Sequence, residues 1–76
     1  MTYANFSDRL ISLRKEQNLS QVKLAKQLNT SRKTVMDWEH NRVLPSFDSI
    51  IALARIFDVS ADYILGISDE AASLPR

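Results

Sequence analysis

Cysteine is absent from this chain of 76 residues, and histidine occurs once, at His40. A chain without cysteine can form neither a disulfide framework nor a thiolate metal site, and a single histidine excludes a zinc site built on paired histidines. Glycine also occurs once, so the sequence contains no glycine-rich phosphate-binding loop. The sequence therefore implies no metal, no cofactor and no small-molecule ligand.

Long hydrophobic runs are missing as well. The longest apolar stretches are only a few residues, far short of the roughly 20 residues that a membrane-spanning helix needs. The first segment, MTYANFSDRL, lacks the basic and then apolar pattern of a secretory signal peptide. We therefore expect a soluble protein of the cytoplasm without a membrane partner.

Catalytic motifs are also missing. Ser20 and Lys23 have the Ser-x-x-Lys spacing of some acyl enzymes, but the companion motifs of those enzymes are absent. Ser20 is better explained as the residue that caps the start of a helix. We therefore expect no enzymatic activity.

The net charge is only +1, but the charges are divided unevenly along the sequence. Residues 1–43 contain eight lysines and arginines against four acids, a balance of +4, whereas residues 44–76 contain two against five, a balance of −3. A basic half can face a polyanion while an acidic half faces away. Ordinary solvated charges would give the same balance, so charge alone does not decide between a polyanion-binding half and a solvated surface.

Hydrophobic periodicity predicts five helices and no strand. Each predicted helix follows a residue that can cap its N-terminus: Asn5, Ser20, Ser31, Ser46 and Ser60. The apolar stripes expected to face the core are Phe6, Leu10 and Leu13; Leu24, Ala25 and Leu28; Val35 and Trp38; Phe47, Ile50, Leu53, Ala54 and Phe57; and the short segment from Ala61 to Leu65. Residues 67–76 have no clear period and are expected to fray, so the predicted domain is residues 1–66.

The five predicted helices need several helix ends, but the chain contains a single glycine, Gly66. Helices commonly end in a residue with a left-handed backbone conformation, and asparagine is the usual substitute for glycine there. Asn18, Asn29 and Asn41 stand at the ends of the first three predicted helices. We therefore predict a positive φ angle at each of these asparagines.

The link between the second and third predicted helices is only two or three residues long, beginning at Asn29. A turn this short suits two helices that cross steeply around a shared core, which is the helix-turn-helix arrangement. Short links and five amphipathic helices together predict a compact all-α domain.

The predicted third helix, residues 31–40, has two unlike faces at about 100° per residue. Val35, Trp38 and Glu39 fall on the inner side; the outer side carries Lys33, Met36, Asp37 and His40, with Arg32 and Thr34 on the flanks. An α-helix fits the major groove of B-DNA, where arginine and lysine donate to guanine O6 and N7, and its N-terminus favours phosphate. The outer side is therefore either a DNA-reading surface or a solvated helix face.

The surrounding pattern, from Leu13 to Leu65, resembles the Cro/repressor-type helix-turn-helix family of bacterial and phage transcription regulators. The most specific parts are LSQ..LA..L at residues 19–28, the helix at residues 31–39, Pro45-Ser46, and LA..F.VS.DYIL at residues 53–65. The resemblance implies a five-helix, lambda-repressor-like domain. It also implies a repressor that binds double-stranded DNA sequence-specifically as a homodimer on a palindromic operator, which would place it at the nucleoid.

Residues that read bases follow from the resemblance, because family recognition helices use their first residues and those one turn later. These positions are Arg32, Lys33, Met36 and Asp37. Asp37 departs from the more usual amide or basic residue. It either orders Lys33 at i,i+4, accepts from cytosine N4 and discriminates against wrong bases, or forms a plain surface ion pair.

Phosphate contacts are also implied by the resemblance. In the family, the glutamine that opens the second helix, here Gln21, contacts a phosphate and braces the recognition helix, and the loop carrying Arg42 touches phosphate. His40 and Lys23 are each either a phosphate contact or an ordinary surface residue. The full expected set is Gln21, Lys23, Ser31, Thr34, His40, Arg42 and Ser46.

Two further expectations are structural. Arg14 and Glu39 match a family pair that forms a partly buried salt bridge between the first and third helices. Exposed members of a group of isoleucines are expected to form a two-fold dimer interface: Ile51, Ile56, Ile64 and Ile67. A competing hypothesis is a protein-binding module, antitoxin-like or anti-repressor, that keeps the fold without reading DNA, since a fold does not determine a function.

Overall fold

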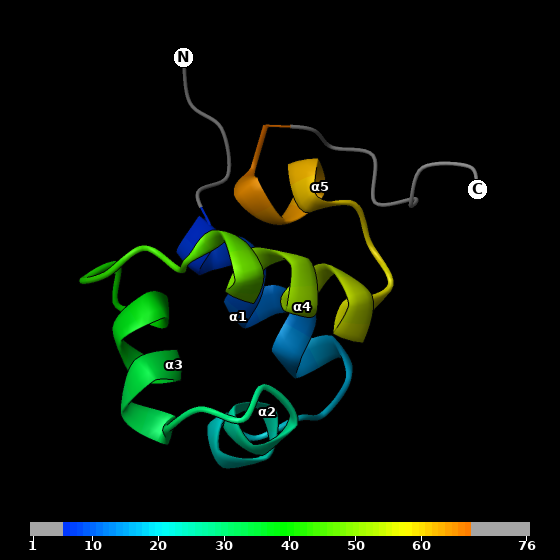
Figure 1. Ribbon diagram of the computed structural model, residues 1–76. Helices are drawn as coiled ribbons and strands as arrows, with labels where there is room; N and C mark the ends of the chain where they lie inside the picture. Colours follow the sequence, from blue (N-terminus) through cyan, green and yellow to red (C-terminus); the bar gives the residue numbers. More distant parts are fainter. Residues whose placement is uncertain (1–5, 68–76) are drawn as a thin grey trace.

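The computed structural model describes residues 6–67, which form five helices and no strand, as the sequence predicts. In chain order they are α1 (Phe6–Glu16), α2 (Gln21–Gln27), α3 (Arg32–Glu39), α4 (Phe47–Phe57) and α5 (Ala61–Leu65) (Figure 1). The predicted N-cap Asn5 and the predicted frayed tail beyond Ile67 lie outside the described residues.

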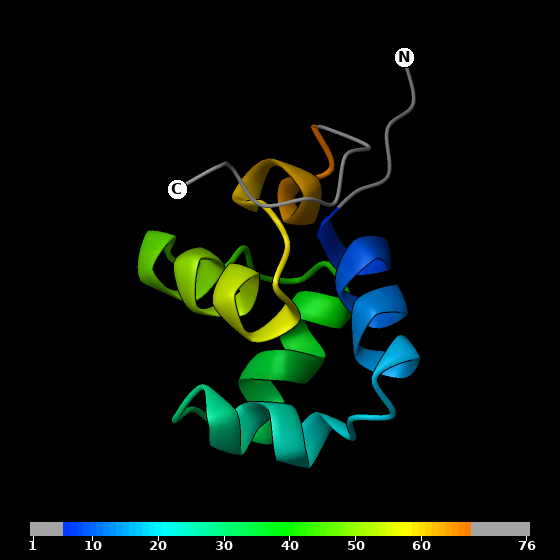
Figure 2. The same cartoon turned by 90° about the vertical axis from the view of Figure 1, so that its right-hand side faces the viewer.

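The helix-turn-helix pair forms one end of the molecule. In both views α2 and α3 lie at the end opposite α5, with α1 and α4 between them (Figures 1 and 2). Helix α3 packs against α2 and α1, and α5 packs against α4 and α1. The helix predicted to read DNA is therefore supported from behind by α1 and α2.

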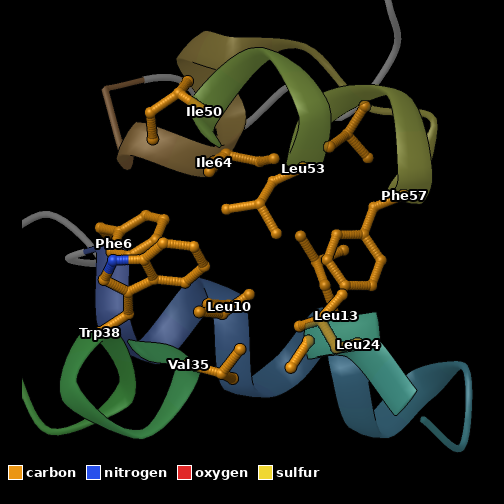
Figure 3. Close-up of a cluster of buried hydrophobic side chains, with 12 residues drawn as sticks. Phe6, Leu10, Leu13, Leu24, Val35, Trp38, Ile50, Leu53, Phe57 and Ile64 are labelled. Carbon is orange, nitrogen blue, oxygen red and sulfur yellow. The ribbon is translucent and has the colours of Figure 1, made fainter. Parts of the chain in front are cut away.

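The core receives one completely buried side chain from each helix (Figure 3). These five residues, each with an exposed fraction of 0 %, are Leu10, Leu24, Val35, Leu53 and Ile64. Burying one such side chain contributes roughly 1.5–3 kcal/mol relative to leaving it in water. The inner side of α3 joins this core through Val35 and through Trp38, whose ring meets that of Phe6 edge-on at a centroid distance of 6.4 Å. The position of α3 is thus set by the same core that holds the other helices.

Two expectations about apolar residues are wrong. Phe47 was expected in the buried stripe of α4, but it is the first residue of that helix and 79 % exposed. It points about 85° around the helix from the mean direction of the buried residues Ile50, Leu53 and Phe57. Ile64 was expected at a dimer surface, but α5 packs against α1 and α4 and turns it fully into the core.

The other isoleucines predicted for a dimer surface have mixed positions. Ile51 and Ile56 are half-buried, and Ile56 packs against the core. Ile67 is 65 % exposed. An interface built on these isoleucines would therefore be scattered.

The starts of four helices have the predicted serine caps. Ser20, Ser31, Ser46 and Ser60 each accept a hydrogen bond from the backbone N–H three residues later. Each serine satisfies one of the N–H groups that a helix start leaves without an intrahelical acceptor.

The ends of all five helices share one turn, the Schellman motif. The left-handed residue is Asn18, Asn29, Asn41, Asp58 or Gly66, with φ between 54° and 83°. In each case the next residue donates its N–H to the carbonyl five residues back. The three predicted asparagines are confirmed. Asp58 was not predicted, although a short polar side chain also tolerates this conformation.

Candidate nucleic-acid interface

The C-terminal end of α3 is tied to α1 by a buried hydrogen bond. Ser7 Oγ donates to the carbonyl oxygen of Trp38 at 2.6 Å and lies 3.5 Å from Asn41 Oδ1. Ser7 is 4 % exposed, so this bond is shielded from water. Sequence reasoning missed Ser7; the available signal was a small polar residue beside Phe6, three positions before Leu10.

The inner side of α3 carries the predicted ion pair to α1. Arg14 Nε lies 2.6 Å from Glu39 Oε2, and Nη2 lies 3.0 Å from Oε1. The two side chains are 14 % and 5 % exposed. Arg14 Nη1 also donates to the carbonyl oxygen of Leu19 at 2.9 Å, which fastens the turn between α1 and α2. The paired geometry predicted for Arg14 and Glu39 is therefore confirmed.

A hydrogen-bonded chain extends from this ion pair to the start of α3. Gln21 Nε2 donates to Glu39 Oε1 at 3.0 Å, and Arg32 Nε donates to Gln21 Oε1 at 3.2 Å. Gln21 therefore braces the recognition helix, as expected. Its predicted phosphate contact stays a prediction.

A shallow hollow lies where α2 and α3 begin. Its volume is about 470 Å³. It is lined by Arg14, Ser20, Gln21, Val22 and Arg32. Arg14 in this lining is paired with Glu39 and bonded to Leu19, so the exposed Arg32 is the cation that borders the depression beside α3. Val22 also lines the hollow, and no pattern in the sequence pointed to this residue.

The outer side of α3 holds a carboxylate between two cations. Lys33 Nζ lies 2.9 Å from Asp37 Oδ2, and Arg42 Nη1 lies 3.4 Å from Oδ1. The side chains of Lys33 and Arg42 are 82 % and 63 % exposed, against 15 % for Asp37. The pKa of the Asp37 carboxyl lies below its ordinary value, mainly because of the hydrogen bond from Lys33. Burial raises the pKa, but by a smaller amount. The predicted i,i+4 pair is present, and Arg42 extends it.

The other predicted phosphate contacts have local partners. Ser31 Oγ and Thr34 Oγ1 lie 3.0 Å apart within the cap of α3, and Ser46 Oγ donates to Ser49 Oγ at 3.0 Å in the cap of α4. His40 Nδ1 lies 2.8 Å from the carbonyl oxygen of Met36. Lys23 is exposed in the first turn of α2. The structure thus gathers Gln21 with Arg32, and Lys33 with Asp37 and Arg42, while the serines serve helix caps.

Residues 6–67 contain neither a cluster of metal-binding side chains nor a membrane-length apolar helix. This part of the chain has no group of three or more histidine, aspartate or glutamate side chains placed to hold a metal ion. No helix in the same range is long and apolar enough to cross a membrane.

Helices α2 and α3 are joined by a tight turn, and α3 buries its inner side in the core while its polar outer side is exposed. This arrangement defines a helix-turn-helix protein. The family model described as helix-turn-helix matches residues 10–64, which include most of α1 and nearly all of α5. The chain belongs to this family, in its Cro/repressor-type branch.

Relatives of the chain are named as transcription regulators. An uncharacterized HTH-type transcriptional regulator of Bacillus subtilis, YobD, is 35 % identical over 65 residues, covering 86 % of this chain and 58 % of that protein. The immunity repressor protein of Bacillus phage phi105 is 36 % identical over 58 residues, covering 76 % of this chain and 40 % of the repressor. The chain thus spans 58 % of the length of the first relative and less of the second.

Solved structures share the fold. The P22 c2 repressor in complex with a synthetic operator superposes with a TM-score of 0.80 at 25 % identity, covering 86 % of this chain and 98 % of that one. The restriction-modification controller protein C.AhdI from Aeromonas hydrophila gives a TM-score of 0.72 at 30 % identity, covering 78 % and 89 %. These likenesses confirm the predicted lambda-repressor-like domain.

Proposed function

We propose that this chain is a sequence-specific double-stranded DNA-binding transcription regulator that acts as a repressor, with α3 in the major groove. The observation that carries the proposal is the construction of α3. The inner side of α3 is held by Val35, Trp38 and Glu39. Its N-terminal residues Arg32 and Lys33 are exposed. The P22 c2 relative binds a synthetic operator through the same fold, which supports the proposal.

Base reading falls to the outer side of α3. Arg32 and Lys33 donate to guanine edges, and Asp37 accepts from cytosine N4 or rejects other bases at that position. Met36 lies on the same side and makes an apolar contact. The phosphate contacts are assigned to Gln21, Lys23, Ser31, Thr34, His40, Arg42 and Ser46. These contacts set the position of α3 on the duplex, and the bases supply the discrimination.

A dimer is part of the proposal. One small domain, residues 1–66, reads a single half-site, and two copies related by a two-fold axis read a palindromic operator about one helical turn apart. Helix α5, which carries Asp62, lies at the end of the molecule opposite α3 and so faces away from the DNA, where its carboxylate is not repelled by phosphates.

A protein-binding module is the second candidate. The observation that favours it is Asp37, which engages both Lys33 and Arg42 and so reduces the positive charge of the outer side. Salt separates the candidates. DNA binding releases counterions from the duplex and therefore weakens steeply as the salt concentration rises, whereas protein pairing through an apolar face does not.

The deciding experiment is selection of bound sequences from a random duplex pool at two salt concentrations. We expect a palindromic consensus that is enriched at both concentrations and bound more weakly at the higher one. Recovery of no preferred sequence at low salt would contradict the proposed function.

A further inference from the structure

The turn that ends α3 carries Arg42, one of the residues assigned to phosphate. Asn41 stands in this turn with a φ of 58°, and its N–H donates to the carbonyl oxygen of Trp38 at 3.2 Å. The N–H of Arg42 donates to the carbonyl oxygen of Asp37 at 2.9 Å. The backbone of Arg42 is therefore positioned by the last turn of α3.

A hydroxyl from another helix enters this turn. The carbonyl oxygen of Trp38 accepts a second hydrogen bond at 2.6 Å, from Ser7 Oγ in the first turn of α1. Ser7 Oγ also lies 3.5 Å from Asn41 Oδ1, and Ser7 is only 4 % exposed. A bond buried in this way is stronger than the same bond in water. It joins the start of α1 directly to the backbone at the end of α3.

A second polar tie between these helices acts on a side chain instead. Arg14 is seven residues after Ser7, about 10 Å further along α1, and it binds the carboxylate of Glu39. The rotatable bonds of the Glu39 side chain separate that contact from the peptide groups of the turn. Of the two ties, the bond from Ser7 is the one that holds the backbone of the turn.

The side chain of Arg42 has little else to direct it. It is 63 % exposed, and its Nη1 lies 3.4 Å from Asp37 Oδ1, which is longer than an ordinary hydrogen bond. A long exposed side chain loses rotamer freedom when it is ordered, and one weak contact offsets little of that cost. The direction of the guanidinium group is therefore set by the backbone from which the side chain starts.

We propose that Ser7 is a positioning residue for DNA binding: its hydroxyl fixes the Trp38 carbonyl and so holds the turn after α3 in the form that presents Arg42 to a phosphate. This role rests on the proposed function, in which Arg42 is a phosphate contact. Ser7 itself is buried and does not meet the duplex. Because phosphate contacts carry no sequence information, Ser7 acts on affinity and not on base choice.

The turn is tested first without DNA, by NMR of the full chain under conditions in which every variant is folded. In Ser7→Ala, the N–H of Arg42 should exchange with solvent at least about tenfold faster, because the turn opens locally. The titration midpoint of the Asp37 carboxyl should rise, because Arg42 is one of the cations that lower its pKa. Arg42→Ala should raise the same midpoint, and the double variant should raise it no further than Arg42→Ala alone.

The second test is the slope of log affinity against log salt on the selected operator. Loss of one phosphate contact lowers this slope by about 0.9. Ser7→Ala and Arg42→Ala should each show that loss, and the double variant should show it once and not twice. The preferred sequence should be the same in all three variants.

Ser60→Ala is the matched control, because it removes the serine cap of α5 at the end of the molecule opposite α3. It should lower the thermal midpoint, as a lost cap does, and leave the exchange of Arg42, the titration of Asp37 and the salt slope unchanged. A Ser7→Ala chain that behaves like this control would overturn the proposal, since Ser7 would then serve stability alone.

Ser7→Cys is the second variant, for the case that Ser7→Ala does not fold. It keeps a weak donor at the same position, so it should show the same changes to a smaller extent, and their absence would overturn the role of Ser7. An unaltered chain without any preference among duplexes would instead contradict the proposed function. An unaltered chain that selects an operator, with a salt slope that Ser7→Ala leaves intact, would contradict only the role of Ser7.

Discussion

Arg32 donates a hydrogen bond to Gln21 across the turn between α2 and α3, with 3.2 Å between Nε and Oε1. The amide of Gln21 also donates to Glu39, which is paired with Arg14. Arg32 is thereby connected, through the half-buried Gln21, to the Arg14–Glu39 pair on the core side of α3. Lys33, the next residue, is held only through the outer carboxylate of Asp37. The two adjacent cations of the recognition helix are therefore positioned by separate means.

Gln21→Ala should weaken DNA binding about tenfold without changing the preferred sequence, because it removes two bracing hydrogen bonds, each worth about 0.5–1.5 kcal/mol, and one phosphate contact. Fluorescence anisotropy on the selected operator and on single-base variants measures both properties. Gln27→Ala, at the exposed end of α2, is the control and should have no effect. A changed base preference would show that Gln21 reads bases.

Lys33→Ala should reduce discrimination between operator and random duplex by about 1–3 kcal/mol, which is the value of a good base contact. The ratio of the two dissociation constants at fixed salt is the quantity to measure. Lys26→Ala, an exposed lysine on α2, should leave that ratio unchanged. An equal loss on both duplexes would reduce Lys33 to a phosphate contact.

Asp37→Asn should strengthen binding to random DNA and make binding more sensitive to salt. The substitution frees Lys33 and Arg42 for phosphates and removes a charge that phosphates repel. The slope of log affinity against log salt should become steeper, and the ratio of operator to random affinity should fall. Asp62→Asn is the control on α5. If the slope and the ratio both stay at their original values, Asp37 is only a surface ion pair.

Glu39→Gln should destabilise the fold by about 3–5 kcal/mol, because Arg14 would remain buried without its carboxylate. Urea unfolding followed by circular dichroism measures this loss. Glu16→Gln, an exposed acid at the end of α1, should change stability little. A Glu39→Gln chain as stable as the original would assign the pair no structural role.

Acid should remove the contribution of Asp37 to stability. Its pKa in the folded chain is lowered, mainly by the hydrogen bond from Lys33, so the contribution is fully present above the ordinary aspartate pKa. It is lost as the pH falls through the lower folded value, below about 3.9. Carbon-13 NMR of the Asp37 carboxyl should show a midpoint below the ordinary aspartate value of about 3.9, and Lys33→Ala should raise it. A midpoint at the ordinary value would contradict the contact.

Local chemistry made much of the fold predictable. The serine caps and the left-handed asparagines depend on a few neighbouring residues, so Ser31 and Asn29 could be assigned from the sequence. Contacts between helices were harder. The bonds of Ser7 to Trp38 and of Arg32 to Gln21 depend on how closely two helices approach, which periodicity does not show. Arg14 and Glu39 were found only through the family resemblance, with the wheel placing Glu39 inward. Phe47 was misplaced because only its i,i+3 relation to Ile50 was considered, whereas its position around α4 is about 85° from the centre of the buried stripe.

The completely buried side chain that each helix contributes to the core has a further consequence. Helix α3 has only eight residues, and isolated helices shorter than about 12–15 residues are marginal in water. The recognition helix therefore exists only while Leu10, Leu53 and Ile64 remain packed behind it. Cleavage of the link between α4 and α5, residues 58–60, would therefore loosen α3 without cutting beside any residue proposed to meet the duplex. The core and the recognition helix would be lost together.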